Sequence, residues 1–130
     1  MKINIIIYIK YSKLSDAIRK SKMPKVTCIV MQRNEDLLVE NWIKYYGYLF
    51  GYDRLIVLDN GSDNTTVIDT LRTYERAGVR VFWGAQSTHD FHEKGNIICR
   101  IIRELEDSGD DSDFYFPAAC AEFLTLYPEN

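Results

Sequence analysis

The sequence is poor in several features that would assign a function at sight. Its 16 lysines and arginines are outnumbered by 19 aspartates and glutamates, and no basic stripe offers a surface for a phosphate backbone. We therefore expect no nucleic-acid partner. The three cysteines, Cys28, Cys99 and Cys120, have no CxxC spacing, which favours buried thiols in a reducing compartment over a disulfide or zinc set. No GxGxxG is present, which disfavours a dinucleotide site of the usual kind.

Long apolar runs are also missing, and a transmembrane helix would need roughly 20 apolar residues. The segment MKINIIIYIK is apolar, but Asn4 and Lys10 break it and it lacks the cleavage site of a signal peptide. We expect residues 1–24 to form an N-terminal extension or an extra strand, and residues 25–130 to form one domain. The expected location is cytoplasmic, with membrane association left open.

Short apolar segments that read as strands alternate with amphipathic segments that read as helices. Strands are predicted at 25–31, 55–58, 79–83 and 114–116, and helical faces at 38–49, 67–74 and 97–105. Asn34 is predicted to cap the first helix, which should end near Gly51. This order predicts an α/β fold, with a mainly parallel sheet and helices on both faces.

In such sheets, ligands bind beyond the carboxyl ends of the strands. Four segments lie there: QRNE, DNGSD, STHDFHEKG and PAACAE. DNGSD is the most informative, because Asp59 ends a strand, Gly61 permits a tight turn, and Ser62, Asp63 and the following Asn64 suit either a helix cap or contacts to a ribose or base. A capped loop without any ligand is the alternative for both QRNE and DNGSD.

The remaining polar segments carry weaker signals. His89 and His92 lack a third ligand at a defined spacing, so a zinc site is disfavoured, whereas Lys94 is a cation that could neutralise a diphosphate. EDSGDDSD is predicted to be a solvated turn because its carboxylates lack the spacing of a calcium-binding loop. The aromatic run WIKYYGYLF has helical spacing and is expected in the core.

Taken together, these segments resemble the nucleotide-binding half of a glycosyltransferase with the GT-A fold, of the family 2-like and family 92-like type. The first strand ends in Asn34 and Glu35, and a helix of the type LLVENWIKYYGYLFGYD follows. The second strand ends in the family's Asp-Asn-x-Ser-x-Asp, here 59–63, and ACAEFL stands where the family has Asp-x-Asp-Glu-Phe. The resemblance covers about residues 25–124.

The resemblance implies aspartates at positions 119 and 121, which would hold Mn²⁺ or Mg²⁺ against the diphosphate of a nucleotide sugar. Here both positions are alanine, Ala119 and Ala121, whose side chains offer a metal no oxygen ligand. We therefore expect a vacated metal site, no metal bound by this chain, and a defective enzyme. An engineered double substitution and a natural pseudoenzyme both stay open as the origin of the pair.

The resemblance also implies roles for the polar residues at the strand ends. Residues expected to line the base and ribose pocket or the loop around it are Gln32, Asn34, Glu35, Asp59, Asn60, Ser62 and Asp63. Lys94 is expected to approach the diphosphate or the base. No catalytic base is identified, because Glu122, the one candidate, more often has a donor-side or structural role in this pattern.

The leading interpretation is thus the donor-binding portion of a glycosyltransferase. The donor is a UDP-sugar by default, and the acceptor is an unknown saccharide, lipid or protein. GT-A domains continue past this motif, so we expect the acceptor half to be missing, and the open sheet edge makes a homodimer plausible. The alternatives are a non-catalytic nucleotide-sugar-binding module and a response-regulator-like domain in which Asp59 accepts phosphate.

Overall fold

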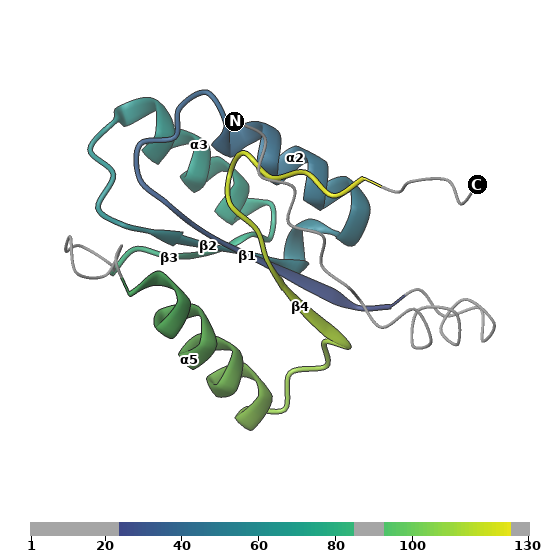
Figure 1. Cartoon of the computed structure of the whole chain (residues 1–130). Coiled ribbons are helices and arrows are strands. Elements are labelled where there is room, and N and C mark those ends of the chain that lie inside the picture. Colours follow the sequence, from purple (N-terminus) through teal and green to yellow (C-terminus); the bar gives the residue numbers. More distant parts are fainter. Residues whose placement is uncertain (1–23, 85–92, 126–130) are drawn as a thin grey trace.

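The structure is a computed structural model that describes residues 24–84 and 93–125 (Figure 1). Its elements alternate in type as predicted. In chain order they are β1 (Val26–Gln32), α2 (Val39–Phe50), a 3₁₀ turn (Tyr52–Arg54), β2 (Leu55–Asp59), α3 (Thr65–Arg76), β3 (Arg80–Phe82), α5 (Lys94–Asp107) and β4 (Phe114–Pro117). The predicted strand or extension over residues 1–24 and both histidines lie outside the described residues, apart from Pro24. No helix in the described ranges is long and apolar enough to cross a membrane.

The four strands form one parallel sheet in the order β3-β2-β1-β4. The chain steps from β1 to β2 to β3 in one direction, then returns past both to place β4 on the other side of β1. The winding direction therefore reverses between β1 and β4. The predicted α/β class is confirmed, and the order equals the first four positions of the 3-2-1-4-5-6 order of doubly wound nucleotide-binding folds.

Helices cover both faces of the sheet, with α2 and α3 on one face and α5 on the other (Figure 1). The strand β1 is buried along its whole length, so its side chains supply both layers of the core. Cys28 and Val30 pack with Trp42 of α2, whereas Ile29 and Met31 pack with α5. This two-sided burial explains why β1 reads as a continuous apolar run rather than an alternating one.

Two predicted helix boundaries are confirmed and one is wrong. Gly51, with φ of 98°, ends α2 and donates its N–H to the carbonyl of Gly47 at 2.9 Å, and Asn64 caps α3 by accepting from the Thr66 N–H at 2.9 Å. Asn34 does not cap α2, which begins five residues later at Val39. Its side chain is instead engaged by the loop after β2.

The cysteines and the acidic loop also depart in part from expectation. Cys28 and Cys120 are buried as predicted, and burial raises the pKa of both thiols, but Cys99 is exposed because α5 turns it away from the sheet.

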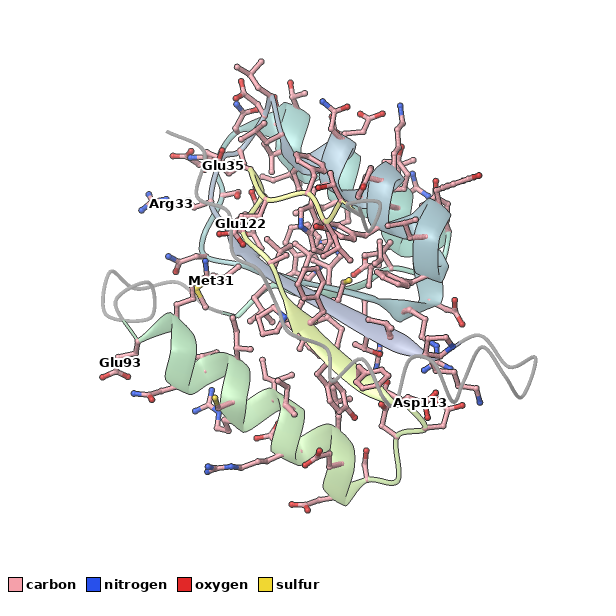
Figure 2. All side chains as sticks on the ribbon, turned by 45° about the vertical axis from the view of Figure 1, so that its right-hand side comes forward. Met31, Arg33, Glu35, Glu93, Asp113 and Glu122 are labelled. Atoms are coloured by element: carbon pink, nitrogen blue, oxygen red, sulfur yellow. The ribbon has the colours of Figure 1, made fainter. Side chains whose placement is uncertain are left out.

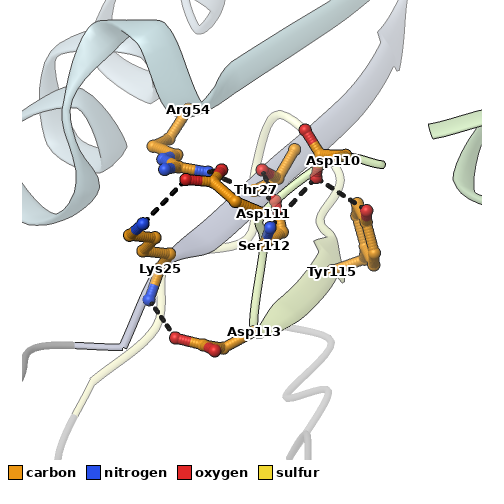
Figure 3. Close-up of polar contacts among 8 residues, drawn as sticks. All are labelled: Lys25, Thr27, Arg54, Asp110, Asp111, Ser112, Asp113 and Tyr115. Carbon is orange, nitrogen blue, oxygen red and sulfur yellow. Dashed lines mark hydrogen bonds and ion pairs between the residues drawn. The ribbon is translucent and has the colours of Figure 1, made fainter. Parts of the chain in front are cut away.

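The acidic loop at 106–113 is largely exposed, and it also connects the segments that precede β1 and β2 (Figure 3). Asp111 accepts from Arg54 Nη1 at 2.8 Å and from Lys25 Nζ at 2.7 Å, and these partners, Arg54 first, hold its pKa well below the usual range.

Candidate ligand site at the carboxyl edge of the sheet

The segments that follow β1 and β4 meet at the point where the winding of the sheet reverses. In open α/β sheets this is the place where ligands bind, because the loops from the two strands diverge there and leave a crevice. Arg33, Glu35 and Glu122 lie at this end of the sheet, and Asp113 lies at the opposite end (Figure 2). The QRNE and PAACAE segments therefore share one edge, as expected from the sequence, and DNGSD follows the neighbouring strand β2.

A buried polar network joins the ends of β1 and β2. Gln32 and Asp59, both only 2 % exposed, pair through a bond of 2.7 Å from Gln32 Nε2 to Asp59 Oδ1. The same oxygen accepts from Ser62 Oγ at 2.5 Å, and Asp59 Oδ2 accepts from the Ser62 N–H at 3.0 Å. Asp59 therefore lies inside the loop and organises it, with three hydrogen bonds satisfying its buried carboxylate.

Asn34 fastens the two loops to one another across their outer side. Its Nδ2 donates to Asp63 Oδ1 at 2.7 Å, and its Oδ1 accepts from the N–H groups of Asp63 and Asn64, each at 3.0 Å. The Asn34 N–H donates to Ser62 Oγ at 2.9 Å. These contacts need a left-handed backbone at Asn34, where φ is 53°, a conformation that asparagine tolerates better than most residues.

Glu35 and Asn60 join the same assembly mainly through their backbones. The Glu35 N–H donates to Gln32 Oε1 at 3.3 Å, and the Asn60 N–H donates to the Gln32 carbonyl at 2.9 Å. Asn60 is 4 % exposed, whereas the side chain of Glu35 is only half-buried. The seven predicted pocket residues thus form one connected structure, whose interior holds Gln32 and Asp59 and whose surface offers Glu35 and Asp63.

Beyond β4 the chain closes a tight turn in which Glu122 is engaged. The Ala118 N–H still pairs with the carbonyl of Ile29 at 3.0 Å, after which the Glu122 N–H bonds to the Ala119 carbonyl at 2.9 Å. Glu122 Oε2 accepts from the Ala119 N–H at 3.0 Å. Tyr46 OH donates to the Glu122 carbonyl at 2.8 Å, which anchors the turn on α2. The Glu122 carboxylate therefore stabilises its own turn.

The residues at this turn do not fit a divalent ion. Ala119 and Ala121 supply no side-chain oxygen, and one oxygen of Glu122 is held by a backbone N–H. Among residues 24–84 and 93–125, no group of three or more His, Cys, Asp or Glu side chains could hold a metal. A hard cation prefers several oxygen ligands, so this donor set falls short of what Mn²⁺ or Mg²⁺ requires.

The charges of Lys94 and Glu35 both affect the pKa of Cys120, which lies at the centre of the PAACAE segment. Burial, and to a smaller extent the negative charge of Glu35, raise the pKa of the Cys120 thiol to about 12, and the positive charge of Lys94 opposes this rise. Lys94 is the first residue of α5 and is half-buried. Two predicted site residues from different elements therefore lie within electrostatic reach of the turn at 119–121.

Arg33 is a candidate for contact with a diphosphate that the sequence-based expectations left out. It is exposed and directly follows β1 at the winding reversal, and no hydrogen bond or ion pair joins it to another described residue. Lys25 and Arg54, by contrast, are paired with Asp111 at the opposite end of the sheet. No local signal in QRNE identifies it, because only the folded chain shows that the side chains of its neighbours Gln32 and Asn34 are already hydrogen-bonded.

Comparisons with known proteins add no family assignment. No protein-family model matches the chain, and neither curated proteins nor solved structures yield a match.

Proposed function

We propose that this chain is the donor-binding portion of a GT-A-type glycosyltransferase that binds the nucleoside part of a nucleotide sugar and is defective in transfer. The observation that supports this most is the strand order β3-β2-β1-β4. It gathers the Asn34–Glu35 loop, the Asp59–Asp63 loop and the turn at 119–122 around a single edge of the sheet. This is the arrangement that the resemblance requires of a nucleotide site.

The defect follows from the chemistry of the leaving group. A departing nucleoside diphosphate gains negative charge in the transition state, and a positively charged group must stabilise that charge. At this turn the chain supplies alanine methyl groups where a metal would need carboxylates. The proposed remaining activity is therefore binding of the base and ribose, with Glu35 and Asp63 at the surface of the pocket and UDP-sugars as the default ligands.

A binding module without catalysis is the second candidate, and the state of Glu122 favours it. Its carboxylate accepts from the Ala119 N–H and so lacks the freedom expected of a catalytic base. A phosphate-accepting role for Asp59 is not favoured, because that carboxylate is 2 % exposed and accepts three hydrogen bonds. A phosphodonor would have to break the loop network to reach it.

Calorimetric titration of UDP and UDP-sugars, with and without Mn²⁺, tests the proposal. The chain is compared with the double variants Ala119→Asp/Ala121→Asp and Ala119→Asn/Ala121→Asn, the second a control of equal size without charge. Affinity that depends on Mn²⁺ only in the aspartate variant supports the transferase origin. Equal metal-free binding by all three proteins supports the binding module. No binding of any nucleotide by any of them contradicts both.

A further inference from the structure

The two faces of the sheet are covered unequally. Among the described residues, α2 and α3 cover one face and α5 alone covers the other (Figure 1). A helix with its side chains is about 10 Å across, and neighbouring strands lie about 4.8 Å apart, so one helix covers about two strands. The face of the sheet that α5 covers therefore has room for a further apolar element beside α5, packed against the outer strand β3.

A groove of 490 Å³ occupies that place, between α5 and the strands β2 and β3. Its apolar lining includes Phe82 of β3 and Ile97, Ile101 and Leu105 of α5, and two charged residues of α5 also line it. Phe82 is 44 % exposed, and of the α5 residues only Ile98 is fully buried, which leaves the other three partly open to water. Apolar side chains left partly open to water contribute favourable free energy when a partner covers them.

Among residues 24–84 and 93–125, the strand β3 next to the groove is an edge strand. It comprises Arg80–Phe82 and pairs there with β2 on one side, so within this part of the chain its other side presents backbone groups to a further strand. An open edge beside an apolar groove is the geometry in which one sheet continues into another. The other outer strand of the sheet, β4, lies beside the candidate ligand site and takes no part in such pairing.

We propose that a second copy of this chain docks here, with the two β3 strands side by side and the two α5 helices antiparallel across the joined grooves. In a two-fold contact, residue i of one copy meets residue j of the other and j meets i, so the surface must be complementary to itself. Arg100 and Glu104 meet this condition. Both border the groove, and their side chains are 69 % and 70 % exposed.

Within one copy these two charges are only loosely paired, with 3.9 Å between Arg100 Nε and Glu104 Oε1. Antiparallel α5 helices bring each Arg100 opposite the partner's Glu104, which gives two opposite-charge contacts around a centre of isoleucine, leucine and phenylalanine side chains. A second copy accounts for both the apolar centre and the balanced charges at its border. The candidate ligand sites, at the carboxyl ends of β1 and β4, lie on the other side of β2 from this contact.

Sedimentation velocity of the full chain, from about 1 to about 100 µM, tests the dimer. The wild-type chain is expected to dimerise within that range. Arg100→Glu places like charges opposite each other twice and is expected to weaken dimerisation about tenfold. The double variant Arg100→Glu/Glu104→Arg restores opposite charges and should recover the wild-type dissociation constant. Circular dichroism verifies that each variant is folded.

Arg103→Glu is the matched control, because Arg103 is an exposed arginine of α5 that does not line the groove. It makes the same change in charge and is expected to leave the dissociation constant unchanged. A wild-type chain that stays monomeric at about 100 µM overturns the proposal. So does a dimer that Arg103→Glu weakens as much as Arg100→Glu, since the contact would then lie on another face of α5.

Discussion

Replacing Asn34 by alanine should loosen the connection between the loops after β1 and β2. The substitution removes the three hydrogen bonds that the Asn34 side chain makes to Asp63 and Asn64. A typical hydrogen bond contributes about 0.5–1.5 kcal/mol, and these lie near the surface, so the low end of that range applies. Alanine must also hold the left-handed backbone, with φ of 53°, at a further cost of about 1 kcal/mol. The expected loss is about 2–3 kcal/mol.

Asn34→Gly separates the two contributions. Glycine adopts a positive φ without strain but cannot make the hydrogen bonds, so its loss should be about 1–2 kcal/mol. We expect stability to fall in the order wild type, Asn34→Gly, Asn34→Ala. Urea unfolding followed by the fluorescence of Trp42 and Trp83 measures the free energy, with an unchanged m-value as the check on two-state behaviour.

Two results would refute this reasoning. A loss below about 0.5 kcal/mol for Asn34→Ala would mean that water replaces the three hydrogen bonds without penalty. A glycine variant less stable than the alanine variant would mean that backbone strain at this position is negligible. In either case the Asn34 contacts would not be what holds the two loops in register.

Three further changes test other parts of the structure. Asp111→Asn should lower stability at neutral pH. The difference from wild type should shrink as the pH falls below about 4, because the pKa of Asp111 is held low in the folded state and its contribution is lost on acidification through that pKa; urea midpoints across pH measure this. Gly47→Ala should cost about 1–3 kcal/mol in thermal unfolding, since the new Cβ would lie 2.2 Å from Cε1 of Tyr52. Arg33→Gln should weaken UDP binding severalfold and leave uridine binding unchanged, as measured by calorimetry.

Each of these has an outcome that contradicts it. A difference between wild type and Asp111→Asn that stays constant from neutral pH to about pH 2 would remove the ionised pair as its source. Gly47→Ala should become neutral or stabilising in a Tyr52→Ala background, and an unchanged loss there would exclude the ring contact. Equal weakening of UDP and uridine by Arg33→Gln would mean that Arg33 acts on the loop rather than on the diphosphate.

The strands and helices were predictable because their signals are local. The strand β1 is a continuous apolar run, α2 repeats its apolar residues at helical spacing, and Gly51 and Asn64 mark helix ends through their own backbone and side-chain preferences. The predicted start of α2 was wrong for a reason that no local pattern carries. In the folded chain the side chain of Asn34 binds the loop after β2 instead of capping α2, because that loop presents two N–H groups to its side-chain oxygen.

The candidate site was predictable as a set of segments but not as a set of roles. The rule that ligands meet strand ends selected QRNE, DNGSD and PAACAE correctly as segments at one edge. The contacts of Gln32 with Asp59 and Ser62 join residues 27 and 30 positions apart. Such contacts exist only once the parallel pairing of β1 with β2 has fixed their register. The finding that Arg33 has no partner among the described residues likewise depends on the folded chain.

The sequence by itself determined the alternation of strands and helices and the absence of side-chain oxygen ligands at positions 119 and 121, because each is a property of composition and short-range spacing. The tertiary structure decided the strand order, the placement of the segments after β1 and β4 next to one another, the hydrogen-bonded state of Asp59 and Glu122, and the open groove beside β3. These depend on which segments become neighbours in space, and many strand orders are compatible with one alternating pattern of strands and helices.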